Sequence, residues 1–177
     1  MASASTIKVI VSDVDGVWTD GSINYIGDRE MKAFNVRDGL GAKLAQRAGI
    51  TVALVTSRRS TALERRAREL GIHELHQGAA NKLDEVQRIC KKLAVELDQI
   101  LYAGDDLPDL ALMMAAGISA APSDASPEVR NAATWKLESR GGAGAFREIV
   151  ERLLRERGEW DRIIQEFAIG KPEAQSI

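Results

Sequence analysis

The stretch Ser12-Asp13-Val14-Asp15-Gly16 decides the fold, because it directly follows the apolar run Ile7–Ser12. A short apolar run rich in β-branched residues is typical of a strand that is buried on both faces, as in a parallel sheet. In such sheets, functional residues collect just beyond the carboxyl ends of the strands. The stretch therefore predicts a buried first strand followed by a chemically active turn.

Further short apolar runs alternate with helical patterns along the chain. We predict strands at Ile50–Thr56, Glu74–Gln77, Ile100–Ala103, Ile118–Ala121 and Trp135–Leu137. We predict helices near Gly39–Ala48, Ser60–Leu70, Asn81–Leu93, Pro108–Ala116, Pro127–Ala133 and Gly144–Glu156. This alternation is typical of a Rossmann-like α/β fold, a three-layer sandwich with a mostly parallel sheet.

One segment departs from this alternation. Ser22–Tyr25 and Met31–Asn35 flank Gly27-Asp28, which is typical of a two-residue turn, so we expect a β-hairpin over residues 22–35, inserted after the first strand. Residues 1–6 are interpreted as an N-terminal extension and residues 170–177 as a flexible tail. The chain is thus expected to form a single domain.

Composition limits the class of protein. Hydrophobic residues make up 45% of the 177 residues and charged residues 28%, with a net charge of −2. This balance suits a globular chain and provides no overall cationic field for nucleic acid or an anionic membrane. The sequence lacks an apolar signal core and a run of ~20 apolar residues, and Cys90 is the only cysteine, so we expect a cytoplasmic location.

Polar residues follow other predicted strands as well. Thr56-Ser57-Arg58 ends the second strand, Gly104-Asp105-Asp106-Leu107-Pro108-Asp109 ends the fourth, and Lys82 begins the helix after the third. Parallel strands end at one edge, so we expect these residues to meet Asp13 and Asp15. Clustered carboxylates repel one another unless a cation neutralises them, and an all-oxygen set suits Mg²⁺. The alternative, that these residues only form turns and helix caps, does not explain the whole set.

This set resembles the four motifs of the haloacid dehalogenase superfamily of phosphotransferases, in the same order. The matching residues are Asp13-x-Asp15-Gly16, Thr56, Lys82 and Gly104-Asp105-Asp106-x-x-Asp109. Within the superfamily, the chain is similar over nearly its whole length to the family of 3-deoxy-D-manno-octulosonate 8-phosphate phosphatases. Those matches are Gly21, Phe34-Asn35-Val36-Arg37-Asp38-Gly39, Gln77-Gly78, Asn81-Lys82, Arg140-Gly141-Gly142 and Gln175-Ser176-Ile177.

The resemblance implies a Mg²⁺-dependent phosphatase that works through an aspartyl-phosphate. Asp13 would attack phosphorus, and Asp15 would protonate the leaving sugar oxygen and later deprotonate the hydrolytic water. Thr56 and Lys82 would hold phosphoryl oxygens. The metal ligands it implies are Asp13, the backbone carbonyl of Asp15, and Asp105.

Two further aspartates have a supporting role in this interpretation. Asp106 and Asp109 would orient Lys82 and metal-bound water. Only 40 residues separate Asp15 from Thr56, and the hairpin and one helix take up most of them, so no cap domain is expected. A site without a cap is open to water, and the resemblance implies closure in a homotetramer whose hairpins pack around a central axis.

The resemblance also implies the substrate contacts. They carry over to Asn35, Val36, Arg37, Asp38, Gly39, Lys43, Arg58 and Arg66. Arginine binds carboxylates in a bidentate manner, which suits an acidic sugar. We also expect the segment Lys171–Ile177 to cover the site of a neighbouring subunit.

Two alternatives stay open at this point. Trp18, followed by Thr19-Asp20-Gly21, resembles the sister branch that acts on nine-carbon ulosonate 9-phosphates, and Ser57 and Lys43 also depart from the pattern of the octulosonate phosphatases. Receiver domains of signalling systems form the second alternative, because they also use aspartate, Thr or Ser, Lys and Mg²⁺ in an α/β fold. In a receiver the phosphorylated aspartate ends a later strand, so the order of motifs favours the phosphatase.

Overall fold

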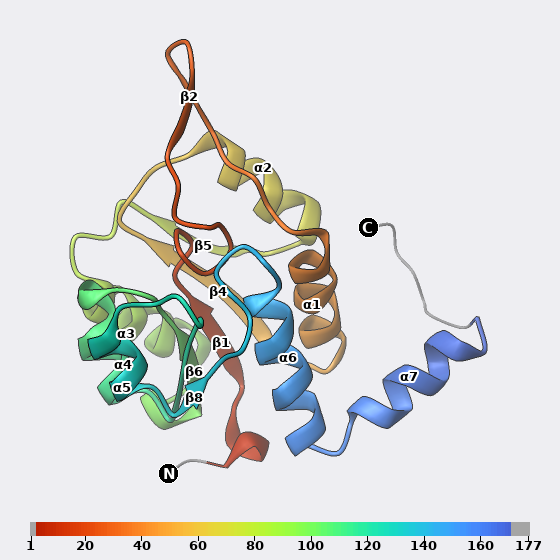
Figure 1. Cartoon of the computed structure of the whole chain (residues 1–177). Coiled ribbons are helices and arrows are strands. Elements are labelled where there is room, and N and C mark those ends of the chain that lie inside the picture. Colours follow the sequence, from red (N-terminus) through yellow and green to blue (C-terminus); the bar gives the residue numbers. More distant parts are fainter. Residues whose placement is uncertain (1–2, 171–177) are drawn as a thin grey trace.

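The computed structural model describes residues 3–170 and contains the expected parallel sheet (Figure 1). Its six strands are β1 (Val9–Ser12), β4 (Thr51–Thr56), β5 (Glu74–Gln77), β6 (Ile100–Ala103), β7 (Ile118–Ala121) and β8 (Trp135–Lys136). They lie in the order β5-β4-β1-β6-β7-β8, and every neighbouring pair is parallel. β1 therefore lies between β4 and β6, and the turn after it is flanked by the carboxyl ends of those two strands.

Helices cover both faces of the sheet, which confirms the predicted three-layer sandwich (Figure 1). One face carries α1 (Val36–Arg47), α2 (Thr61–Leu70) and α6 (Ala145–Glu156), and the other carries α3 (Lys82–Leu93), α4 (Leu110–Ala115) and α5 (Pro127–Ala132). Three short 3₁₀ helices complete this set: η1 (Ala4–Thr6), η2 (Leu97–Gln99) and η3 (Leu107–Asp109). A separate apolar cluster fills the space between the sheet and each helical layer.

Trp18 belongs to the apolar cluster beneath α1 and α6. Its side chain is only 1% exposed, its ring centroid lies 4.3 Å from that of Phe146, and its Nε1 donates to Ser12 Oγ at 3.2 Å. A large aromatic ring with one polar atom is well satisfied in such a place. The residue that suggested a nine-carbon sugar therefore packs inside the protein and does not line the strand-end cavity.

The inserted hairpin is present as predicted, with β2 (Asn24–Ile26), β3 (Arg29–Met31) and the two-residue turn Gly27-Asp28. Gly27 has a φ of +58°, as this kind of turn requires. The hairpin projects from the sheet edge at the top of Figure 1 and forms its own two-stranded sheet. Tyr25 and Ile26 on it are 70% and 66% exposed.

Two terminal segments differ from the sequence-based prediction. The structure adds α7 (Trp160–Ala168), which was not among the predicted helices. Near the start of the chain, η1 buries Ala4 in the core, so part of the expected extension belongs to the fold. The roles predicted for Lys171–Ile177 lie outside the described residues.

Within residues 3–170, no helix combines the length and apolar character that crossing a membrane requires.

Candidate active site

A cavity of about 330 Å³ opens at the carboxyl ends of β1, β4 and β6. Eleven residues line it: Asp13, Asp15, Gly21, Thr56, Ser57, Arg58, Lys82, Asp105, Asp106, Pro108 and Asp109. The sheet thus brings together every residue that was predicted to act on phosphate or to hold metal. Because these residues come from strand ends far apart in sequence, the convergence follows from the parallel topology.

Asp13 and Lys82 form the centre of this cavity. Lys82 Nζ lies 2.9 Å from Asp13 Oδ2 and 2.7 Å from Asp109 Oδ1, and both Asp13 and Lys82 are buried. Burial raises the pKa of Asp13 to about 6, although the charge of Lys82 opposes the rise. Burial alone would lower the pKa of Lys82, but attraction to Asp13 and Asp109 outweighs it, so the pKa of Lys82 is raised and its amine stays charged.

Asp109 is held on both carboxylate oxygens. Oδ1 accepts from Lys82 Nζ and, at 2.5 Å, from the buried hydroxyl of Tyr102, while Oδ2 accepts from the backbone N–H of Asp105 at 2.9 Å. Tyr102 was not among the predicted site residues, although a tyrosine in an otherwise apolar buried strand needs a polar partner for its hydroxyl. Asp109 therefore fixes both Lys82 and the loop after β6.

Asp106 lines the same cavity but points its carboxylate at its own loop. Its Oδ1 accepts from the backbone N–H of Leu107 at 2.8 Å, so it caps the short helix η3. Within the described part of the chain, Lys82 pairs with two carboxylates, those of Asp13 and Asp109. Asp106 and Asp109 were predicted together to orient Lys82 and metal-bound water, and the structure places Asp109 against Lys82 and Asp106 against its own loop.

Three carboxylates lie close enough to bind one cation. Oxygens of Asp13, Asp105 and Asp109 all lie within 4.8 Å of one another. Burial, followed by repulsion from Asp13 and Asp109, raises the pKa of Asp105 to about 8. Gly16, with a φ of +90°, permits this approach, since a Cβ there would lie 1.9 Å from Asp105 Oδ2. The donors are all oxygen, so the cluster fits a hard divalent ion such as Mg²⁺.

Asp15 turns its side chain away from this cluster and toward the hairpin. Its Oδ1 accepts from Lys32 Nζ, and its Oδ2 lies 3.8 Å from Arg58 Nε. Glu30 joins Lys32 to Arg58, whose Nη2 lies 2.5 Å from Glu30 Oε2. Glu30 and Lys32 were not among the predicted site residues. The signal is that two oppositely charged residues, two positions apart in an extended segment, project from the same face.

Thr56 ends β4 with its side chain buried at the cavity. Its hydroxyl oxygen accepts from the backbone N–H of Arg58 at 3.2 Å, which leaves the hydroxyl proton free for another acceptor. Thr56 lies at the cavity, and its contact with a phosphoryl oxygen stays a prediction. Ser57 beside it is exposed and also lines the cavity.

The other predicted substrate contacts do not line this cavity in the described chain. They are Asn35, Val36, Arg37, Asp38, Gly39, Lys43 and Arg66. Val36 and Arg37 are exposed beside the hairpin, whereas Asn35 caps α1 by accepting from the N–H of Arg37 at 2.8 Å. A substrate bound in the cavity would therefore reach the exposed members of this set only where it extends out of the cavity.

Asp38 cannot touch a ligand directly, because it is completely buried. Its Oδ1 accepts from the backbone N–H of Arg147 at 2.8 Å, in the first turn of α6. Burial raises the pKa of Asp38, although backbone hydrogen bonds from α6 oppose the rise. Asp38 therefore joins α1 to the start of α6, and its predicted substrate contact is replaced by a helix-capping role.

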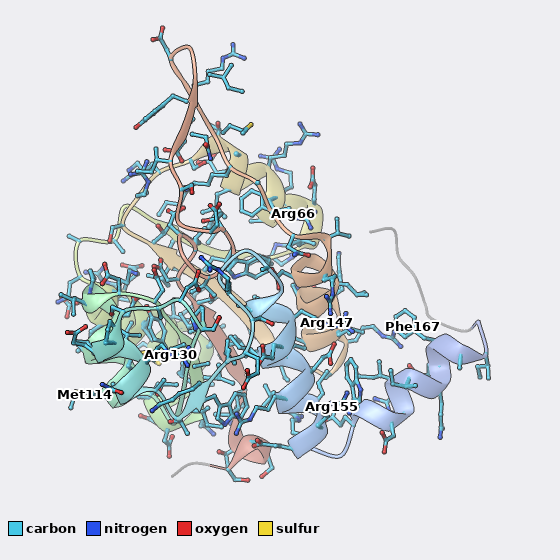
Figure 2. The ribbon with its side chains drawn as sticks, in the orientation of Figure 1. Arg66, Met114, Arg130, Arg147, Arg155 and Phe167 are labelled. Carbon is cyan, nitrogen blue, oxygen red and sulfur yellow. The ribbon has the colours of Figure 1, made fainter. Side chains whose placement is uncertain are left out.

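Arg66 of α2 lies against the first turn of α1 at Gly39, which is buried. Figure 2 shows Arg66 reaching from α2 to the first turn of α1, and a Cβ on Gly39 would lie 2.2 Å from Arg66 Nη2. Lys43 lies further along α1, with its Nζ beside the C-terminal end of α2 at Gly71. A cation there stabilises the helix terminus, which explains Lys43 structurally.

Comparison with known proteins identifies similar chains. The family model of haloacid dehalogenase-like hydrolases matches residues 69–149. The 3-deoxy-D-manno-octulosonate 8-phosphate phosphatase of Escherichia coli strain B is 42% identical over 163 residues, which cover 91% of this chain and 86% of that protein.

Solved structures agree with this similarity. The same kind of phosphatase from Moraxella catarrhalis, in complex with a magnesium ion, a phosphate ion and a KDO molecule, has a TM-score of 0.90 and 39% identity, covering 93% of this chain and 95% of that one. The cobalt-bound phosphatase from Haemophilus influenzae has a TM-score of 0.89 and 39% identity, with 93% and 98% covered. These proteins share both the fold and the chain length.

Proposed function

This chain belongs to the 3-deoxy-D-manno-octulosonate 8-phosphate phosphatase family of haloacid dehalogenase-like hydrolases, and from that premise we propose that it hydrolyses this sugar acid phosphate to the free sugar acid and phosphate. One observation in the structure carries the proposal. Asp13, Lys82, Thr56 and Asp105 meet in a single cavity at the strand ends. A buried carboxylate beside a charged lysine is arranged to meet a phosphoryl group.

The first step is assigned to Asp13 and Asp15. A carboxylate oxygen of Asp13 forms a bond to phosphorus as the bond from phosphorus to the sugar oxygen breaks, which gives an aspartyl-phosphate. Asp15 donates a proton to the departing sugar oxygen. In the second step Asp15 takes a proton from water, the water oxygen bonds to phosphorus, and the carboxylate of Asp13 is released with inorganic phosphate.

The remaining cavity residues bind and orient the phosphoryl group. Lys82, fixed by Asp109, and the free hydroxyl proton of Thr56 contact phosphoryl oxygens. Asp13, Asp105 and the backbone carbonyl of Asp15 would hold Mg²⁺. When bound, this ion neutralises the carboxylates and the negative charge on the phosphoryl group.

The proposed sugar contact is Arg58, whose guanidinium borders the cavity beside Asp15. The sugar acid carries a carboxylate, which the two-pronged donor of arginine matches. A homotetramer remains part of the proposal, because the exposed apolar residues of the hairpin, such as Tyr25 and Ile26, would be buried between copies. A cytoplasmic location also remains a prediction.

The test is a comparison of kcat/KM over four classes of substrate: 3-deoxy-D-manno-octulosonate 8-phosphate, ketodeoxynonulosonate 9-phosphate, N-acetylneuraminate 9-phosphate and ordinary hexose phosphates. We expect the eight-carbon acid to be preferred. A preference for a nine-carbon acid would move the chain to the sister branch, and a preference for a hexose phosphate would contradict the acidic-sugar assignment. Steady turnover, measured as phosphate release, separates the enzyme from a receiver, which is labelled only once.

A further inference from the structure

Two charged side chains of the hairpin contact residues that line the active-site cavity. Glu30 lies on β3. Lys32 comes two residues after Glu30, just beyond the end of the strand, so both side chains project from one face of the hairpin. Arg29 and Met31 alternate with them and are exposed on the other face. The legs of the hairpin join the turn after β1 to the start of α1 (Figure 1), and this places Lys32 beside Asp15.

These residues form a closed ring of ion pairs with the cavity. Lys32 Nζ contacts Asp15 Oδ1 and lies 3.1 Å from Glu30 Oε1, and the side chain of Lys32 is only 3% exposed. Arg58 completes the ring through Glu30 and Asp15. A buried amine between two carboxylates is held firmly. If the amine moved away from them, water could not take their place at this buried position.

The two oxygens of the Asp15 carboxylate therefore differ. Oδ1 is occupied by Lys32 and, at 3.4 Å, by the hydroxyl of Thr19. Oδ2 is buried and accepts no hydrogen bond from residues 3–170, since Arg58 Nε, at 3.8 Å, lies beyond hydrogen-bond distance. A proton in transit to or from a substrate needs an oxygen with an open lone pair, and in this arrangement that oxygen is Oδ2.

We propose that Lys32 is a positioning residue, which holds Oδ1 of Asp15 so that Oδ2 faces the leaving oxygen and the hydrolytic water. This inference rests on the proposed function, in which Asp15 transfers the proton. It makes the hairpin part of the acid–base apparatus of its own subunit, in addition to its expected contact with other copies. A misplaced catalytic group can lower a rate by about 10²-fold.

Leaving groups of different basicity reveal such a role. A sugar alkoxide leaves poorly and needs the proton from Asp15, whereas p-nitrophenolate leaves without one. Rapid mixing isolates the first step, because the first turnover of p-nitrophenyl phosphate releases p-nitrophenolate before Asp15 acts as a base. A fault in the orientation of Asp15 slows the first turnover of the sugar phosphate and spares the first turnover of the nitrophenyl ester.

The decisive variant is Lys32→Met, which keeps the length of the side chain and removes its charge. We expect the first-turnover rate with the sugar acid phosphate to fall about tenfold to a hundredfold, with KM within about threefold of the parent. The p-nitrophenol burst should keep the parental rate. Arg29→Met, on the opposite face of the same strand, removes an equal charge and should leave both rates unchanged.

Further variants keep the proposal open to contradiction. Lys32→Arg should retain more of the sugar phosphate rate than Lys32→Met, because it restores a donor. Should Lys32→Met not fold, as judged by its thermal melt, Glu30→Gln leaves Lys32 in place and loosens it, and we expect the same selective loss at about threefold to tenfold.

Equal slowing with both substrates, or no slowing with either, would overturn the role of Lys32. Asp15→Asn separates this result from a failure of the proposed function. If Asp15→Asn slows the sugar phosphate selectively and the hairpin variants do not, only the inference about Lys32 is wrong. If Asp15→Asn shows no selectivity, the assignment of Asp15 fails, and the inference fails with it.

Discussion

The strand-end cavity lies next to the hairpin, yet the two regions treat charged and apolar side chains in opposite ways. In the cavity, charged groups such as Asp13, Lys82 and Asp109 are buried and pair with one another. On the hairpin, apolar groups such as Tyr25 and Ile26 stand exposed. The cavity carries an excess of negative charge, whereas within residues 3–170 these apolar side chains of the hairpin remain largely uncovered. This difference suits a cation in the cavity, and it underlies the prediction that the hairpin packs against other copies of the chain.

The largest effect should come from Asp13→Asn, which removes the nucleophile. An amide oxygen does not form the aspartyl-phosphate, so turnover of the sugar acid phosphate should fall by roughly 10⁴-fold or more. Phosphate release measures this loss. Turnover near the parental rate would exclude Asp13 as the nucleophile.

The thermal stability of Asp13→Asn should not fall together with its turnover. Because the folded-state pKa of Asp13 is raised from 3.8 to about 6, its stabilising contribution is present at low pH and is lost as the pH rises through that interval. In chelator at pH 8, Asp13→Asn should therefore melt at or above the parental temperature. The advantage of the variant should shrink as the pH falls toward 4.

Removal of metal is the next largest change. Chelation by EDTA should abolish turnover and Mg²⁺ should restore it, because the repulsion among Asp13, Asp105 and Asp109 is then neutralised. Ca²⁺ should inhibit, since its larger and looser shell fits the site poorly. Added Mg²⁺ should also raise the melting temperature of the parent but not of Asp105→Asn. Full activity after exhaustive chelation would contradict the metal site.

Asp38 tests whether the start of α1 is structural. Asp38→Ala removes a helix cap and should lower the free energy of unfolding by about 1–2 kcal/mol, while Asp38→Asn keeps an acceptor for the N–H of Arg147. The raised pKa of Asp38 means that the folded state disfavours its charge. The stability of Asp38→Asn relative to the parent should therefore increase as the pH rises above 4. A large change in KM for Asp38→Asn, with stability unchanged, would return Asp38 to the substrate contacts.

The smallest effect on the fold should come from the hairpin surface. Ile26→Asp places a charge on an exposed residue, so the folded subunit should lose no more than about 0.5 kcal/mol, yet the oligomer should dissociate in sedimentation experiments. Met114→Asp is the matched control, because Met114 is also exposed but lies on α4, away from the hairpin (Figure 2). An unchanged mass for Ile26→Asp would exclude the hairpin from the contact between copies.

The sequence predicted the strand-end part of the site well because local pattern and topology were sufficient there. Asp13, Thr56 and Asp105 each follow a buried strand, and parallel strands bring such residues together. Tyr102 and Lys32 were missed because their importance depends on a contact made only in three dimensions. The burial of Asp38 could not be predicted for the same reason, since the sequence around it does not indicate that α6 packs there.

The central place of β1 in the sheet also bears on how the chain folds. β1 is the first strand in the sequence, but one of its partners, β6, ends at Ala103. During synthesis, one edge of β1 therefore stays unpaired until more than half of the chain has emerged from the ribosome. Contacts between distant parts of a chain slow folding and leave strand edges open to wrong partners. The nascent N-terminal half should consequently need a chaperone's protection more than the finished protein does.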